Sequence, residues 1–181
     1  MPSSDPVIID ITCTLRMERD SATVFRYLAD LRLDARWRKE VHQTRIEPAE
    51  GRRMGVAVQD AYLSRRVPHH LTRLQCMHYE PGRCIAFETL PGSPFWQQTI
   101  RTVQPVPGGA LVTYRLLFDA AVVRFGLGFP LPPFFIRWYT RTTMKRYLAR
   151  LKTILEQSPI RGKTPRNRPA AAVAVPRKQA R

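Results

Sequence analysis

The side chains that could do chemistry in this sequence are tyrosine hydroxyls and a few acids, and none lies in a recognisable catalytic motif. Tyr62, Tyr79 and Tyr114 fall in segments of alternating polarity. Inside a cavity, such hydroxyls can orient a carbonyl or protonate an enolate. More often a tyrosine buries its ring and keeps its hydroxyl in water. Asp60 lies within an apolar strand, where an acid usually faces solvent or pairs with an arginine. No catalytic residue is therefore assigned.

The histidines and cysteines show no metal-binding pattern. His69 and His70 are adjacent, so on a strand they point to opposite faces and cannot easily hold one ion. Cys13, Cys76 and Cys84 have no metal-ligand spacing, and an odd number cannot all pair within the chain. We expect no metal and no cofactor. Unpaired cysteines are also typical of a reducing, cytoplasmic setting.

The elements that must position these residues begin with a strand and two short helices. Residues 7–17 alternate strictly between apolar and polar, which is the period of a half-buried strand. The period then becomes helical, and Asp20 or Ser21 can cap the helix by accepting backbone N–H bonds. A second short helix is expected across LDARWRK, with Trp37 turned inward.

The middle of the chain predicts six further strands. Turn signals separate them: EPAEG, EPGR, LPGSP and PVPGG. Short strands at this spacing, with no helical runs between them, indicate an antiparallel meander. The predicted strands cover residues 41–48, 56–66, 70–80, 84–90, 95–105 and 110–120.

The chain then becomes helical again and ends in a basic tail. Residues 137–156 place Met144 and Leu148 on an apolar stripe, so they predict a long amphipathic helix. The following segment is rich in Pro, Ala, Lys and Arg, has no aromatic residue and predicts disorder. We therefore divide the chain into a ligand-binding domain at 1–157 and a tail at 158–181.

Several segments together resemble the START-like, or SRPBCC, superfamily, which includes polyketide cyclases and lipid-transport-like proteins. The segments are SATVFRYLADLRLDARWRKEV, HYEPGRCIAF, VPGGALVTYRLLF and YLARLKTILE, within residues 7–156. The resemblance implies an α+β helix-grip fold. In that fold a curved antiparallel sheet of about seven strands wraps around a long C-terminal helix, and two short helices follow the first strand. It implies no catalytic residue, because one fold hosts many activities.

The resemblance also implies an internal cavity, and the alternation of the strands indicates which side chains line it. Such a wall suits a hydrophobic ligand with one or two polar groups. The alternative is that these residues form a filled core, as aromatic residues on strands usually do. The predicted ligand-binding residues are Tyr62, Phe87, Trp96, Tyr114, Leu116, Phe118, Met144 and Leu148.

The chain is strongly basic, with a formal net charge of +16. Residues 159–181 hold seven basic residues and no acid, which leaves 23 basic against 14 acidic residues, or +9, on the body. Such a charge favours anionic partners: a membrane surface, a nucleic acid or an acidic ligand. The alternative is a solvated basic surface with no specific partner.

An apolar segment, residues 122–135, joins the last strand to the long helix. It is either a lid or an insertion into a membrane interface, where Trp and Tyr beside Arg are common. The alternative is that it packs on its own domain as a cap. The predicted membrane-docking residues are Phe134, Phe135, Trp138, Arg137 and Arg141.

These observations favour binding or transport of a hydrophobic small molecule, such as a lipid, quinone or polyketide, by a cytoplasmic protein at an anionic membrane surface. The alternative is an enzyme of the same fold, a polyketide cyclase or aromatase. An RNA- or ribosome-associated protein ranks third, because RNA stacking needs surface aromatics on a basic strand face. The sequence defines no oligomeric state.

Overall fold

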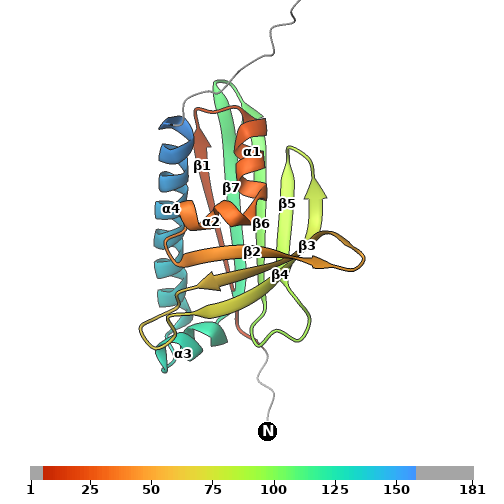
Figure 1. The fold of residues 1–181 in the computed structure, drawn as a ribbon. Coiled ribbons are helices and arrows are strands. Elements are labelled where there is room, and N and C mark those ends of the chain that lie inside the picture. The colour runs from red at the N-terminus through yellow and green to blue at the C-terminus, as the bar shows by residue number, and fades with distance from the viewer. Residues whose placement is uncertain (1–5, 158–181) are drawn as a thin grey trace, which may run out of the picture.

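One antiparallel sheet runs through the computed structural model, which describes residues 6–157 (Figure 1). Its seven strands follow the order β1-β7-β6-β5-β4-β3-β2. The predicted tail, residues 158–181, lies outside the described residues. The strands are β1 (Ile8–Met17), β2 (Val41–Ala49), β3 (Arg52–Ala61), β4 (His70–Glu80), β5 (Cys84–Thr89), β6 (Gln97–Val106) and β7 (Gly109–Asp119).

The sheet is strongly curved, because β2, β3 and β4 cross the other strands steeply (Figure 1). Register shifts in β2 and β4 mark irregularities that let the strands bend. Gly55 lies opposite one of them with a φ of 66°. A Cβ atom there would lie 2.5 Å from the Glu47 carbonyl oxygen, so only glycine fits. The bend leaves a concave face that helices cover.

Two short helices follow β1, as the sequence predicts. The first, α1 (Ser21–Ala29), begins at Asp20, whose side chain accepts a hydrogen bond of 2.8 Å from the Thr23 backbone N–H. A short turn, η1 (Leu31–Leu33), leads into α2 (Asp34–Trp37). Trp37 is fully buried. The α2 helix thus inserts its side chains between the sheet and the long helix.

The long helix, α4 (Pro133–Gln157), runs beside β1 on the helix-covered face (Figure 1). It begins four residues before the predicted start. Its buried residues are Ile136, Met144, Leu148, Leu151 and Leu155, at the three- and four-residue spacing of one helical face. The predicted helix-grip fold is confirmed.

The segment that joins β7 to α4 contains a helix that the sequence analysis did not predict, α3 (Ala121–Leu127), which ends at Gly128 in the left-handed conformation. Two local predictions are wrong. Tyr62 was placed within a strand, but β3 ends at Ala61. Trp96 was placed within a strand, but β6 begins at Gln97. Among residues 6–157, no helix combines the length and the apolar character needed to cross a membrane.

Candidate functional site

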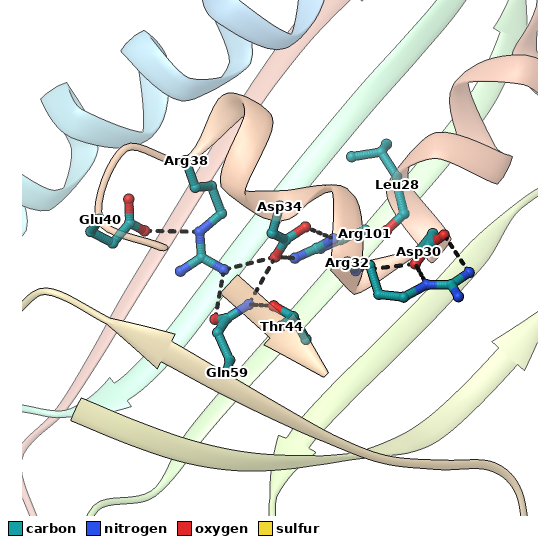
Figure 2. A network of polar contacts seen from close by, with 9 residues as sticks. All are labelled: Leu28, Asp30, Arg32, Asp34, Arg38, Glu40, Thr44, Gln59 and Arg101. Carbon is teal, nitrogen blue, oxygen red and sulfur yellow. Dashed lines mark hydrogen bonds and ion pairs between the residues drawn. The ribbon is translucent and has the colours of Figure 1, made fainter. Parts of the chain in front are cut away.

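A buried ion pair joins α2 to the sheet (Figure 2). The Arg101 guanidinium on β6 donates two hydrogen bonds to the Asp34 carboxylate, of 2.8 and 2.6 Å. It donates a third, of 2.8 Å, to the Leu28 carbonyl oxygen at the end of α1. Both charged side chains are fully buried. The pair therefore holds α1, α2 and β6 together without access to solvent.

Aromatic rings enclose Arg101. Its guanidinium carbon lies 5.3 Å from the ring centre of Trp37, 5.5 Å from that of Tyr114 and 5.8 Å from that of Phe87. Cations are attracted to the faces of such rings, and desolvation strengthens the attraction. Arg101 is therefore a structural residue, because its surroundings leave no room for a ligand.

A second buried arginine, Arg38, shares the same carboxylate but is only partly satisfied. Its Nη1 donates to Asp34 at 3.1 Å and to the Gln59 side-chain oxygen at 3.4 Å. Its Nε donates to Glu40 at 2.8 Å. Its Nη2 makes no hydrogen bond within residues 6–157 and points away from the network in Figure 2. Arg38 lines a cavity, and its unpaired Nη2 atom is not enclosed by protein, so a ligand can reach it.

This cavity, which we call the α4 cavity, lies between the sheet, α3 and α4. Its volume is about 300 Å³, at the lower end of the range for small-molecule sites. Its polar end consists of Arg38, Glu40, Gln59 and Tyr147. Its apolar wall consists of Leu63, Phe95, Trp96, Leu116, Phe118, Val122, Val123 and Met144.

The polar end offers hydrogen-bond donors and one carboxylate. Burial, together with the negative charge of Glu40, raises the pKa of Tyr147, so its hydroxyl stays protonated. Glu40 Oε2 is buried and has no hydrogen-bond partner among the described residues. Burial also lowers the pKa of His70, another lining residue, which keeps it neutral at pH 7. A ligand carbonyl or hydroxyl would meet complementary groups here.

The predicted ligand-binding residues divide between cavity and core. Tyr114 and Leu148 are fully buried in the hydrophobic core. Phe87 is buried and lines a second hollow, under α1. The remaining five line the α4 cavity: Tyr62, Trp96, Leu116, Phe118 and Met144.

The second hollow, which we call the α1 groove, has a volume of about 400 Å³. Phe25, Leu31, Ile46 and Met54 line it, and it shares no lining residue with the α4 cavity. Its polar edge carries Asp30, which is already hydrogen-bonded to a neighbouring arginine. The α1 groove is thus apolar and lacks an unpaired buried donor at its base among the described residues.

Sequence reasoning missed the polar end. Arg38 and Glu40 lie in the run RWRKE, where three basic residues surround Trp37 and no periodicity says which points inward. The burial of Arg101 could be predicted, because the alternation of β6 places it on the same face as Thr99 and Val103. Both of those neighbours are buried. A charge at an inward strand position indicates a buried partner.

Asp60 pairs with a histidine instead of the expected solvent or arginine. The His69 Nδ1 atom lies 3.0 Å from its carboxylate, and the centre of the His42 ring lies 5.0 Å from that of the His69 ring, with the two rings tilted by 40°. Among residues 6–157 no group of three His, Cys, Asp or Glu side chains is placed to hold a metal ion. This cluster therefore tethers the β3–β4 connection.

The predicted membrane-docking residues are exposed at the start of α4. Phe134 is 70% exposed and Trp138 is 62% exposed, and Phe135 contacts both rings. Arg137 and Arg141 are exposed on the same helix. These three aromatic side chains therefore do not pack on the domain, whereas Phe125, earlier in the joining segment, packs against Phe95 and His70.

The fold and the cavity together define a helix-grip protein of the START-like class. Residues 9–156 match the family described as polyketide cyclase / dehydrase and lipid transport. The chain belongs to this family. Family and fold support a protein that binds hydrophobic small molecules. No curated protein sequence matches the chain.

Solved structures share the fold at low sequence identity. A START superfamily protein from Mycobacterium smegmatis has a TM-score of 0.66 and 14% identity, over 82% of this chain and 97% of that one. The di-domain ARO/CYC BexL from the BE-7585A biosynthetic pathway has a TM-score of 0.61 and 17% identity, over 84% of this chain and 51% of that one. Ara h 8.0201 has a TM-score of 0.56 and 10% identity, over 83% of this chain and 99% of that one. These likenesses show the fold alone.

Proposed function

We propose that the protein binds a hydrophobic small molecule in the α4 cavity, such as a lipid, quinone or polyketide, and fixes its polar group on Arg38. The observation that carries the proposal is the free Nη2 group of Arg38 at the end of an apolar cavity. Hydrogen bonds to a charged group are stronger than those between neutral groups, so a ligand oxygen that accepts from Nη2 gains affinity. Few polar groups in an apolar pocket are the usual arrangement for specificity.

The charges of the cluster favour an uncharged acceptor at Arg38 itself. Asp34 and Glu40 carry two negative charges, which balance the positive charges of Arg38 and Arg101. A ligand anion placed directly on this neutral cluster would meet both carboxylates. A ketone, quinone or ester carbonyl accepts the Nη2 hydrogen bond without that repulsion. The ligand class at this position is therefore a carbonyl compound with an apolar body.

Cavity filling tests this proposal. Val123→Trp adds volume to the wall of the α4 cavity, and Ile46→Trp adds volume at the exposed rim of the α1 groove. Displacement of a neutral apolar fluorophore should show binding weakened at least tenfold, about 1.4 kcal/mol, by the first substitution only. Loss through Ile46→Trp with none through Val123→Trp would place the ligand in the α1 groove.

The cavity is proposed to load at an anionic membrane surface. Tyr139 is 63% exposed, lines the α4 cavity and follows Trp138 directly. Phe129 and Phe134 are also exposed. Aromatic residues beside arginines suit the bilayer interface, and basic residues near an anionic surface contribute about 1 kcal/mol each. In this proposal, insertion of the aromatic residues at the start of α4 brings the cavity mouth beside a lipid source.

Vesicle cosedimentation tests the membrane proposal. Binding to anionic vesicles should exceed binding to neutral ones and should weaken with salt. Replacing Phe134 and Phe135 with Ser should reduce binding at unchanged net charge. Leu71→Ser with Met77→Ser, two exposed apolar residues on β4, is the matched control. Equal binding to both lipids, or to neither, would reject membrane docking, and preferential binding to RNA would favour a nucleic-acid partner instead.

Glu40 supports a second candidate function, cyclisation of a poly-β-carbonyl substrate. Its carboxylate lies between Arg38 and the Tyr147 hydroxyl, as a base would beside donors that stabilise an enolate. A structurally similar chain is an ARO/CYC protein. Glu40→Gln should then retain substrate binding and lose product formation. A bound poly-β-ketone that stays unchanged on the natural protein would reject catalysis.

A further inference from the structure

A third hollow adjoins the α4 cavity on its outer side, and we call it the basic vestibule. Its volume is about 680 Å³, and it lies between α4 and the chain that links α2 to β2. The two hollows share part of their walls, so what fills one lies next to the other. The shared residues are Glu40, Tyr62, Tyr139, Thr143 and Tyr147.

Positive charge surrounds the basic vestibule. Arg146 and Arg150 are four residues apart on α4, so they project from one face of the helix, and Lys39 faces them from the α2–β2 link. All three are exposed, and within residues 6–157 none of them forms an ion pair. The one acid in the wall, Glu40, is already bonded to Arg38. The positive charge of the basic vestibule is therefore uncompensated.

The rest of α4 shows that this is a local arrangement. Lys152 lies 3.6 Å from Glu156 and also donates to the Arg16 carbonyl oxygen. The positive charge of Lys145 acts on the pKa of the Cys13 thiol, which lies on β1 and does not line the basic vestibule. Only part of the basic surface of the helix thus lines a hollow. That part borders the polar end of the ligand cavity.

We propose that the basic vestibule binds the anionic head group of the ligand whose apolar body occupies the α4 cavity. The inference rests on the proposed function of that cavity. The natural ligand is then an anionic amphiphile: a carboxylate, sulfate or phosphate lies among Lys39, Arg146 and Arg150, and the carbon chain passes Tyr147 into the cavity. A carbonyl along that chain reaches Arg38. The charge and the carbonyl of such a ligand occupy separate sites. This matches the neutral cluster around Arg38 and the positive charge of the adjoining basic vestibule.

Two probes with the same acyl chain test the inference, namely decanoate and its methyl ester. Decanoate ends in an anion, and the ester ends in a neutral carbonyl group. By isothermal titration calorimetry at low salt, decanoate should bind about tenfold more tightly than the ester, and higher salt should remove most of that advantage. Inorganic phosphate should compete with decanoate but not with the ester, as expected if the head group alone occupies the vestibule.

Charge variants locate the effect. Replacing Arg146 and Arg150 with Gln should weaken decanoate binding about tenfold and leave the ester unchanged. The control Lys145→Gln with Arg45→Gln removes the same charge at exposed residues that line neither hollow, and it should change neither affinity by more than about twofold.

The results distinguish a failure of the proposed head-group site from a failure of ligand binding in the α4 cavity. Equal affinities of the natural protein for decanoate and ester would overturn the anionic head group and leave the cavity function standing. An equal loss of decanoate binding in the control protein would overturn the location. Failure of both probes to bind would overturn the cavity function and the inference together.

Discussion

Arg101 and Arg38 are both buried, and both donate to Asp34, yet they differ in what remains of their hydrogen-bonding capacity. Both terminal nitrogens of Arg101 donate hydrogen bonds to Asp34, and one of them also donates to the Leu28 carbonyl oxygen. Its guanidinium lies among three aromatic rings. Arg38 keeps one N–H group free, at the end of an apolar cavity. The first is an enclosed structural contact, whose Nε atom lacks a partner but lies out of reach of a ligand, and the second leaves a donor that a ligand can reach.

The same contrast holds between the two hollows on the helix-covered face. The α1 groove is the larger, about 400 Å³ against about 300 Å³, yet its polar edge pairs Asp30 with Arg32. The α4 cavity combines apolar walls with an unpaired donor. Volume alone would rank the α1 groove above the α4 cavity. The chemistry of the lining identifies the binding site.

The largest expected effect comes from breaking the enclosed Asp34–Arg101 ion pair. Asp34→Ala leaves the Arg101 charge buried without a carboxylate, which should lower the free energy of unfolding by about 3–5 kcal/mol. Glu80→Ala is the control, because its pair with Arg83 is exposed, and it should cost about 1 kcal/mol or less. Urea denaturation measures both. Similar losses in the two variants would mean that the buried pair is not what fixes α2 to the sheet.

The next effect separates the structural wall of the α1 groove from the ligand-facing wall of the α4 cavity. Phe25 is 3% exposed and packs in the core, so Phe25→Ala should cost about 3–5 kcal/mol. Val123→Ala, on the partly exposed α3 wall, should cost about 1 kcal/mol or less. The thermal and denaturant midpoints test both. An unchanged midpoint for Phe25→Ala would remove α1 from the core.

Arg38 should affect ligand binding more than stability. Arg38→Met leaves Asp34 paired with Arg101, so the free energy of unfolding should fall by about 1–3 kcal/mol, less than for Asp34→Ala. Affinity for a carbonyl ligand should fall about tenfold or more. Arg38→Lys keeps the charge but lacks the planar guanidinium, and should restore stability better than binding. Unchanged affinity in Arg38→Met would make Arg38 a structural residue like Arg101.

The smallest effect concerns an exposed carboxylate, Asp20, as the counterpart of Asp34. The hydrogen bond from the Thr23 N–H lowers the pKa of Asp20 below its ordinary value of 3.8. A lowered pKa means that the carboxylate stabilises the fold above that value, and the contribution is lost as the pH falls through the folded-state pKa. Asp20→Ala should cost about 1 kcal/mol at pH 7 and little near pH 2. A cost that persists at pH 2 would contradict the cap.

Strands, helices and core followed from the sequence because they depend on local periodicity. The alternation of residues 7–17 and the stripe through Met144 and Leu148 each repeat a signal over many positions. Element ends were less certain, since Tyr62 and Trp96 both fall just outside strands. The alternation of polarity along a β-strand often continues into the adjoining loop. It therefore does not define the exact residue at which a strand ends.

The site itself was only half predictable. Leu116 and Phe118 could be assigned because apolar side chains alternate along β7. Alternation does not say whether an inward residue faces a ligand or the core, so it does not distinguish Leu116 and Phe118 from Tyr114, and the helical stripe likewise does not mark Leu148 as a core residue. The positions of Arg38 and Glu40 in the cavity depend on the contact between α2 and Gln59 on β3. No local sequence pattern predicts that contact. Buried polar clusters arise from tertiary structure, which the periodicity of one sequence does not specify.

The most direct test of the account is a crystal structure of the protein with a long-chain ketone, dodecan-2-one. We expect its carbonyl oxygen about 2.9 Å from Arg38 Nη2 and its chain against Leu116 and Phe118 in the α4 cavity. A ketone bound in the α1 groove, or bound in the α4 cavity with its oxygen away from Arg38, would contradict the central claim that the unpaired arginine defines the site.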